Sequence, residues 1–219
     1  MRTAALRNSQ IVSQKAGTSS SEPPAPPLPG LVAATAGPAD AAPSPARIPV
    51  NCGQLPFLIK RDGTWLYRGS PITRKPMVCL FSTVLKREAD GSYLLETPAE
   101  RGTIEVEDAP FIAVELTWTG HGSRQSLCFR TNVDQCITAG PDHPIRISHD
   151  LLTSEPTPYL HVRHGYGSHP IEARINRATY YELVALAEPG MLQGRKVLGV
   201  WSEGVFFSLG DLPRGYKGK

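Results

Sequence analysis

The sequence lacks the features that define several common classes of protein. It has four cysteines in 219 residues, spaced too widely for the disulfide framework of a small secreted domain. No apolar stretch approaches the ~20 residues that a membrane-spanning helix needs. The formal net charge of +3 is too small to signal nucleic-acid binding. We therefore expect a soluble, cytoplasmic protein with neither a membrane segment nor a nucleic-acid partner.

Motifs of catalytic and cofactor sites are also missing. A hydrolase nucleophile elbow requires Gly-x-Ser-x-Gly, and Ser202 has Val200 where the first glycine is required. The glycine pairs in Gly120–Gly122 and Gly165–Gly167 lack the third glycine of a dinucleotide-binding loop. The cysteines lack the Cys-x-x-Cys spacing of structural zinc. The sequence therefore predicts no cofactor and no metal site.

Residues 1–48 differ in composition from the rest of the chain. Eight of the 21 prolines fall in residues 1–45, and the segment has no aromatic residue. It cannot bury enough apolar surface to offset the entropy of ordering, so we predict a disordered tail. Only basic charges precede Glu22, a pattern that also resembles an organellar targeting segment.

The remaining residues contain two helix patterns between runs of short strands. Asp62–Gly63 separates two extended runs and predicts a tight hairpin. The first helix pattern covers residues 77–85, with Thr73 as its expected N-cap and Pro76 in its first turn. The second begins after Asn176, another favourable N-cap.

The two helix patterns belong to a weak internal repeat. Ile72–Arg74 opens the first and Ile175–Arg177 opens the second, an offset of about 103 residues that superposes Leu80 on Leu183. We predict an α+β fold with two similar lobes, each a curved antiparallel sheet with one packed helix. The expected divisions of the chain are 1–48, 49–113 and 114–219.

Arg74 and Arg177 each fall in the first turn of a predicted helix. Positive charge there opposes the helix dipole and costs ~0.3–1 kcal/mol. A residue that breaks a local rule without evident gain points to a function, and two arginines beside free helix N–H groups can form an anion site. The alternative is that each arginine pairs with an acid such as Glu107, Asp108 or Glu203.

Three histidines lie close together in the sequence, at His161, His164 and His169. Three imidazoles can hold a metal ion. His161 and His164 would point to opposite faces of a strand, however, and the stretch that follows His164 is rich in glycine and serine. We therefore interpret them as surface histidines.

Glu107 and Asp108 form the one plausible acid/base pair in the sequence. Neighbouring residues on a strand face opposite sides, so the two carboxylates can share a site only if Pro110 marks a bulge. No nucleophile with an obvious base accompanies them. An acid/base enzyme is therefore the weaker alternative.

Several segments together resemble a bacterial family. They are Asp62–Ile72, Val106–Phe111, Thr131–Asn132, Pro158–Arg163 and Gly199–Gly204. Over about residues 49–210 the chain resembles the family known as domain of unknown function 1285 (DUF1285).

The resemblance implies duplicated lobes, with a second lobe loosely similar to pleckstrin-homology-like folds. It also implies a ligand site between the lobes for a nucleotide-like molecule, with a role in signalling. The matched positions that it offers as site residues are Trp65, Arg74, Glu107, Asp108, Arg163 and Trp201. The stretch Gly165–His169 departs from the pattern by being longer and richer in glycine.

Residues and resemblance together favour a non-catalytic binding module for a small anionic ligand, held by guanidinium and aromatic side chains from both lobes. The second hypothesis is a protein-interaction adaptor that pairs an exposed sheet edge with a partner strand. The full set of candidate ligand-binding residues is Trp65, Arg74, Glu107, Asp108, Arg163, Arg177 and Trp201.

Overall fold

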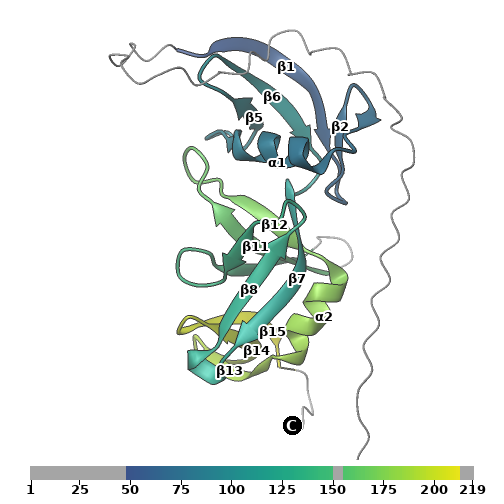
Figure 1. The fold of residues 1–219 in the computed structure, drawn as a ribbon. Coiled ribbons are helices and arrows are strands. Elements are labelled where there is room, and N and C mark those ends of the chain that lie inside the picture. Colours follow the sequence, from purple (N-terminus) through teal and green to yellow (C-terminus); the bar gives the residue numbers. More distant parts are fainter. Residues whose placement is uncertain (1–47, 150–154, 213–219) are drawn as a thin grey trace, which may run out of the picture. The chain divides into compact units, whose positions relative to one another are not determined.

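The computed structural model describes residues 48–149 and 155–212. The predicted disordered tail therefore lies outside the described residues, apart from Ile48. Within these ranges, fifteen strands form three sheets, and two α-helices accompany them (Figure 1). None of the helices in the described ranges is long and apolar enough to cross a membrane.

The first sheet and its helix form what we call the N lobe. Its strands lie in the order β3-β2-β1-β6-β5-β4. The elements of the N lobe are β1 (Val50–Ile59), β2 (Trp65–Tyr67), β3 (Ser70–Pro71), α1 (Lys75–Thr83), β4 (Leu85–Arg87), β5 (Tyr93–Glu96) and β6 (Glu100–Val106). The predicted hairpin turn at Asp62–Gly63 joins β1 to β2, with Gly63 at φ +83°. A Cβ on Gly63 would lie 2.7 Å from side-chain atoms of Asn132 and Ile112, so no other residue fits this turn without displacing its neighbours.

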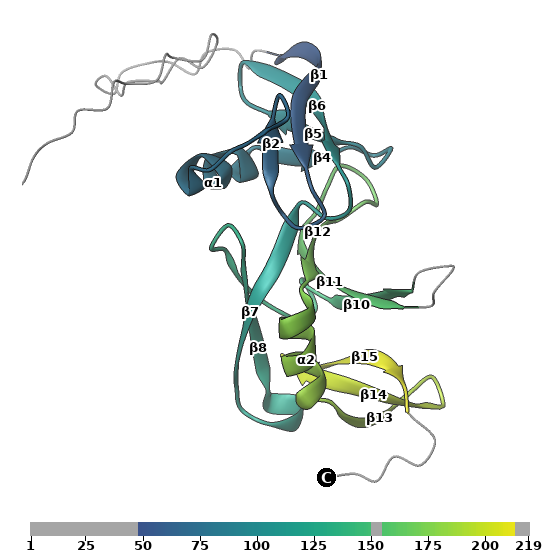
Figure 2. The same cartoon turned by 90° about the vertical axis from the view of Figure 1, so that its right-hand side faces the viewer.

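The second and third sheets, with one helix, form what we call the C lobe (Figure 2). The second sheet has the order β10-β11-β12-β7-β8-β9 and the third the order β13-β14-β15. The elements of the C lobe are β7 (Phe111–Thr119), η1 (Gly122–Arg124), β8 (Ser126–Thr131), β9 (Cys136–Thr138), β10 (Ile145–His149), β11 (Pro156–Arg163), β12 (Ile171–Ile175), α2 (Arg177–Ala185), β13 (Glu188–Leu192), β14 (Arg195–Ser202) and β15 (Val205–Asp211). The α+β architecture of two curved sheets with one helix each is thus confirmed, with a small third sheet added.

Each six-stranded sheet contains one parallel pair of strands, which the prediction of antiparallel sheets omitted. β1 pairs with β6 in parallel in the N lobe, and β12 pairs with β7 in parallel in the C lobe. In both sheets this pair lies at the centre and joins two three-stranded meanders. Sequence periodicity does not reveal such pairs, because side chains alternate in the same way in parallel and antiparallel strands.

The two helices occupy different places in their lobes. α1 follows β1–β3 and precedes β4–β6 of one sheet, whereas α2 follows all six strands of the second sheet and precedes the third sheet. Their N-caps, Arg74 and Asn176, lie 102 residues apart, one fewer than the offset expected from the sequence. Phe81 rather than Leu80 therefore corresponds to Leu183. Burial agrees with this register, because Leu183 is fully buried whereas Leu80 is 55% exposed.

The caps of the two helices differ. Asn176 was expected as an N-cap, and its Oδ1 accepts a hydrogen bond from the backbone N–H of Thr179 at 2.8 Å. In α1 the predicted cap Thr73 is wrong by one residue. Arg74 occupies the N-cap position and its side chain makes no capping hydrogen bond. Pro76 lies in the first turn of α1 as predicted, where its missing N–H is not needed.

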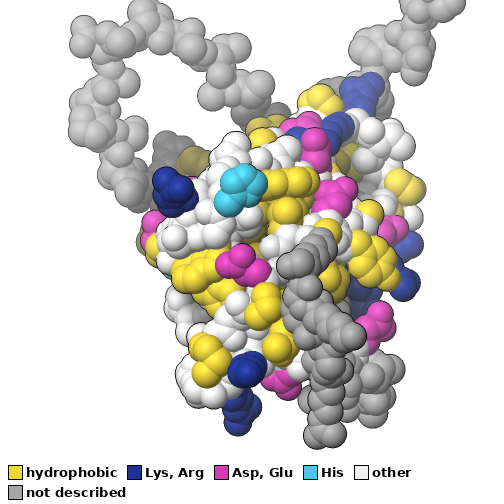
Figure 3. Space-filling view, turned by 90° about the horizontal axis from the view of Figure 1, so that it is seen from below, with side chains coloured by type: hydrophobic (Ala, Val, Ile, Leu, Met, Phe, Trp, Pro, Cys, Tyr) yellow, Lys and Arg dark blue, Asp and Glu magenta, His cyan; other side chains and the backbone are white. Residues whose placement is uncertain are grey.

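The main hydrophobic core lies mostly in the C lobe. Of the 24 buried residues that form it among the described residues, six precede Phe111 and belong to the N lobe. The lower face of the C lobe also carries exposed hydrophobic side chains, interspersed with single charged ones (Figure 3). Large hydrophobic residues exposed in this lobe include Trp118, Tyr181, Met191 and Leu192.

Candidate functional site

The two lobes meet at a set of hydrogen bonds in which Arg163 is central. Arg163 is half-buried at the end of β11, and its Nη2 donates to the carbonyl oxygens of Ser82 at 2.6 Å and Leu85 at 2.9 Å. The last carbonyl groups of a helix have no partner within it, and a cation is favoured at that end. Burial lowers the pKa of Arg163, but these two acceptors compensate for the loss of water. Arg163 therefore fastens the end of α1 to the C lobe.

Asn132 makes a second connection between the lobes. Its Oδ1 accepts from the backbone N–H of Ile112 at 3.0 Å, and its Nδ2 donates to the carbonyl oxygen of Gly63 at 3.3 Å. At the start of α1, Lys75 pairs with Asp134 of the β8–β9 turn at 2.7 Å. These side chains hold the hairpin and the helix of the N lobe against the C lobe.

A row of polar side chains lies on one face of β10, β11 and β12, and we call it the polar strip. Its members are Arg146, Tyr159, His161, Glu172 and Arg174. Arg146, Tyr159 and Arg174 are cross-strand partners, and His161 is opposite Glu172. Residues two apart on a strand share a face, so all five project from the same side of the sheet.

Asp108, in the segment that joins the lobes, binds the polar strip. Its Oδ1 accepts a hydrogen bond from the hydroxyl of Tyr159 at 2.7 Å, and its Oδ2 lies 3.6 Å from Arg174. Burial and the bond to Asp108 raise the pKa of Tyr159 to about 12, so the phenol stays protonated and donates. Arg146 makes a bidentate pair with Glu172 at 2.5 and 2.7 Å and stacks over the Tyr159 ring. The charges of the strip are therefore largely paired with one another.

The histidine end of the polar strip is less completely paired. His161 is 7% exposed, and its Nδ1 is 2.7 Å from the carbonyl oxygen of Asp142. Its ring centre lies 4.7 Å from that of His164 and 5.8 Å from that of His143. Burial lowers the pKa of His161, and the neighbouring imidazoles add to this effect. The expectation that His161 and His164 point apart is wrong, because β11 ends at Arg163 and His164 begins a loop.

His161, His164 and His169 line a cavity of about 300 Å³. The lining comes from the β9–β10 connection and from the loop between β11 and β12: Pro141, Asp142, Pro144, His161, His164, Gly165, Gly167, Ser168, His169 and Pro170. We call it the histidine pocket. Its volume is at the lower end of the range for small-molecule sites. Among the described residues, no group of three or more histidine, cysteine, aspartate or glutamate side chains has the arrangement of a metal site.

The loop that closes the histidine pocket also touches the N lobe. The backbone N–H of Tyr166 donates to the carbonyl oxygen of Arg87 at 2.6 Å, and its hydroxyl donates to Glu96 at 3.0 Å. Arg87 in turn donates to the carbonyl oxygen of Pro170 at 2.6 Å. A Cβ on Gly165 would lie 2.8 Å from the Arg87 carbonyl oxygen, so this close approach requires glycine. The glycine-rich departure noted at Gly165–His169 is thus a contact between lobes.

The two helix-opening arginines are not brought together. Arg74 is exposed at the start of α1 and makes no side-chain contact within the described residues. Arg177 is exposed at the start of α2, where its Nε donates to the hydroxyl of Tyr181 at 2.8 Å. Neither contacts the histidine pocket, and neither pairs with Glu107, Asp108 or Glu203. The anion site expected from their pairing therefore has no counterpart in this arrangement.

The other expected site residues are spread over four places. Trp65 is 1% exposed in the core of the N lobe, and its indole N–H is buried without a hydrogen-bond partner. Trp201 lies on β14, where its ring contacts Phe206 at 5.1 Å. Glu107 accepts a hydrogen bond from the backbone N–H of Arg61 at 2.8 Å and so fixes the β1–β2 hairpin. Asp108 and Arg163 are the two that reach the lobe interface.

Sequence reasoning missed most of the polar strip. Arg146, Tyr159 and Glu172 lie on three different strands, and their alignment depends on strand register. A single sequence does not fix that register. In the sequence, the close spacing of His161, His164 and His169 is the one signal of this site. From the sequence we interpret these residues as surface histidines and do not predict the pocket.

The fold and this site define a class of protein: a two-lobed α+β chain with a small polar pocket where the lobes touch, and no recognisable catalytic constellation among its described residues. Residues 43–109 match the model of the DUF1285 N-terminal domain, and residues 110–209 match the DUF1285 C-terminal domain, a protein of unknown function. The chain belongs to the DUF1285 family. A search of the curated proteins finds no match.

A solved structure agrees with this assignment. The chain is similar to a DUF1285 family protein from Silicibacter pomeroyi DSS-3, with 42% sequence identity and a TM-score of 0.67 over 80% of this chain and 91% of that one. It is more distantly similar to a DUF1285 family protein from Shewanella baltica OS155, at 24% identity and a TM-score of 0.46, covering 60% of this chain and 91% of that one.

Proposed function

We propose that the chain is a non-catalytic binding module that takes a small anionic, nucleotide-like ligand in the histidine pocket. The proposal includes the cytoplasmic location and the signalling role that the family resemblance implies, and the likeness of the C lobe to pleckstrin-homology-like folds. The observation that carries it is the pocket itself, in which His161, His164 and His169 line one cavity beside the lobe interface.

The chemistry of the lining suits an anion. Protonated imidazoles donate two hydrogen bonds each, and the Ser168 hydroxyl adds another donor. Burial, together with the neighbouring imidazoles, lowers the pKa of His161. An anion in the pocket would favour the protonated form of His161 and would therefore bind more tightly at lower pH.

The position of the pocket also supports a signalling role. Its loop donates to Arg87 and Glu96 of the N lobe through Tyr166. A ligand that orders this loop would strengthen the contact between lobes, and one that displaces it would weaken that contact. A signal requires that the ligand-bound and ligand-free states differ in this way, here in the strength of the contact between the lobes.

The test is thermal denaturation of the full chain with inorganic phosphate and with a panel of nucleoside mono- and diphosphates, at pH 6 and pH 8. A ligand at ten times its Kd stabilises by about 1.4 kcal/mol, which raises the Tm by a few degrees. The double variant His161→Asn/His164→Asn should abolish the shift, whereas His121→Asn, an exposed histidine outside the pocket, should retain it. No shift at millimolar ligand, or a shift unchanged in the double variant, contradicts the proposal.

A further inference from the structure

The N lobe has a free strand edge beside a groove. β1 spans Val50–Ile59, yet β2 pairs with it only over Phe57–Ile59. The other side of β1 is occupied by β6. Within the described part of the chain, the backbone of Val50–Leu55 therefore has no strand partner on the β2 side. A strand edge without a strand partner is a template for an added strand, although the Gly53 N–H already donates to Asn51 Oδ1 at 2.9 Å.

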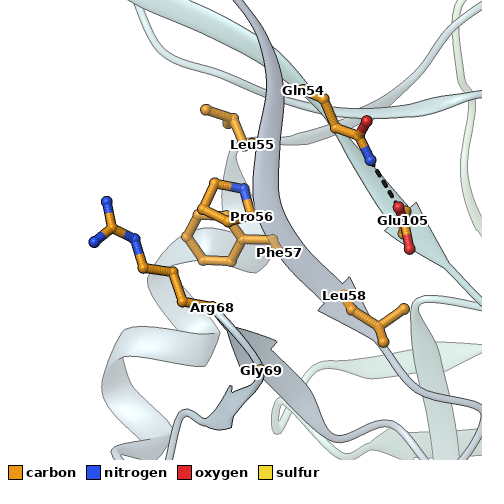
Figure 4. A pocket seen from close by; sticks show the side chains of 8 residues that line it. All are labelled: Gln54, Leu55, Pro56, Phe57, Leu58, Arg68, Gly69 and Glu105. Carbon is orange, nitrogen blue, oxygen red and sulfur yellow. Dashed lines mark hydrogen bonds between the residues drawn. The ribbon is translucent and has the colours of Figure 1, made fainter.

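A groove of about 360 Å³ lies at the point where β2 stops covering β1 (Figure 4). Its lining consists of Gln54, Leu55, Pro56, Phe57, Leu58, Arg68, Gly69 and Glu105. Figure 4 shows Leu55, Pro56 and Phe57 on the same side of β1 as Arg68. Glu105 lies on the other side of β1 from Arg68, where it accepts a hydrogen bond from Gln54 at 2.7 Å.

The groove continues into a half-covered apolar surface. The Phe57 ring lies 4.9 Å from Tyr67 and 5.1 Å from Phe81 between ring centres, and all three residues are half-buried. On the same helix as Phe81, Leu80 is 55% exposed. The one fully buried residue of α1 is Ser82. Apolar area of this kind remains exposed to water in the isolated chain and is available to a partner.

Arg68 supplies a charge for recognition. It is exposed, it makes no ion pair within the described residues, and its guanidinium contacts the Tyr67 ring at 5.4 Å. Arg68 and Gly69 have φ values of +50° and +79°, which fix the turn that holds this side chain beside the groove. A guanidinium without an acidic partner at the rim of an apolar groove is complementary to a carboxylate.

We propose that the N lobe docks an extended acidic segment of a partner protein, which adds as a strand to the edge of β1 and places a carboxylate on Arg68. Main-chain hydrogen bonds would give the affinity, and alternate side chains would enter the groove and the Phe57 surface.

The experiment starts with selection of a displayed library of random twelve-residue peptides on the full chain. We expect enrichment of sequences in which aspartate or glutamate alternates with β-branched residues. For a selected peptide, fluorescence anisotropy should show about a tenfold weaker Kd with Arg68→Glu and an unchanged Kd with Arg61→Glu, an exposed arginine of the same lobe outside the groove. A peptide with lysine in place of its acid should bind Arg68→Glu better than it binds the unaltered chain.

Two measurements separate strand addition from other modes of binding. Hydrogen exchange of the amides of residues 50–55 should slow when the peptide binds, and methylation of alternate peptide nitrogens should abolish binding. The proposal is overturned if no peptide is enriched, if the selected peptides bind Arg68→Glu equally well, or if exchange at residues 50–55 is already slow in the free chain. The histidine pocket takes no part in this test, so the two proposals succeed or fail independently.

Discussion

The N lobe and the C lobe each contain a six-stranded sheet and one helix, but they differ in how completely they bury the helix. The helix of the C lobe buries Thr179 and Leu183 fully, whereas α1 of the N lobe leaves every apolar residue at least partly exposed. The C lobe also supplies 18 of the 24 buried residues in the main core. The C lobe therefore contributes most of the buried core, whereas the N lobe leaves its helix incompletely covered.

This difference shows why the N lobe depends on contacts with its neighbour. Three of its features are held by C-lobe side chains: the end of α1 by Arg163, the start of α1 by Asp134, and the Gly63 turn by Asn132. A sheet with a small core gains little from apolar burial, so these polar contacts carry a larger share of its stability. Because the core of the N lobe is small, part of its apolar surface stays exposed, and this is where we place the partner segment.

The largest expected effect is a difference in the free energy of unfolding between substitutions at equivalent positions of the two helices. Leu183→Ala should lower the free energy of unfolding by about 3 kcal/mol, because it creates a cavity in a fully closed core. Phe81→Ala should cost less, about 1 to 2 kcal/mol, although it removes a larger side chain, since Phe81 is only half-buried. Urea denaturation of both variants provides the measurement. An equal or larger loss for Phe81→Ala would show that the N lobe is as well packed as the C lobe.

The next effect tests whether the N lobe depends on the C lobe. Arg163→Ala leaves the carbonyl oxygens of Ser82 and Leu85 without this donor and should cost about 2 kcal/mol. Hydrogen exchange should speed up in α1 before it does in α2. Arg177→Ala, which removes an exposed arginine from the C lobe itself, serves as the control and should change stability little. Uniform acceleration of exchange in both helices would contradict the dependence.

The sequence predicted the local features of this fold better than its long-range ones. The Asp62–Gly63 hairpin, the Asn176 cap and Pro76 in the first turn were all correct, because each depends on the conformation of a few neighbouring residues. The parallel pairs β1–β6 and β12–β7 were missed, since they join strands distant in sequence. The repeat was found, but aligning it on arginines rather than on caps displaced it by one residue.

The site was harder to predict for the same reason. Arg163 was chosen as a ligand contact, and the structure uses its Nη2 to bind the end of α1. Trp65 has the residue type of a stacking platform but is enclosed in the core. The histidine pocket requires a strand to end at Arg163 so that His164 can turn back toward His161. The end of a strand at this position depends on tertiary packing and does not change the alternation of apolar and polar residues in the sequence.

A smaller effect sharpens the comparison at the helix starts. Asn176→Ala removes the hydrogen bond to the N–H of Thr179 and should cost about 1 kcal/mol. Arg74→Asn should increase stability, because the N-cap of α1 has extended dihedral angles and lacks a capping side chain. Thermal denaturation of the two variants gives both signs directly. If Arg74→Asn destabilises the chain, Arg74 has a stabilising role that its lack of contacts does not reveal.

The smallest effect concerns pH and distinguishes the histidine pocket from the rest of the C lobe. Burial holds the pKa of His161 below 6.5 in the folded chain, so the unfolded chain takes up this proton at a higher pH. Stability contributed by neutral His161 is present above pH 6.5 and is lost as the pH falls toward its folded-state pKa. His161→Asn, which offers an amide donor to the Asp142 carbonyl oxygen, should flatten the stability profile below pH 6.5. His164→Asn replaces an exposed ring and should keep most of the slope, so an equally flat profile in both variants would contradict the assignment of this effect to His161.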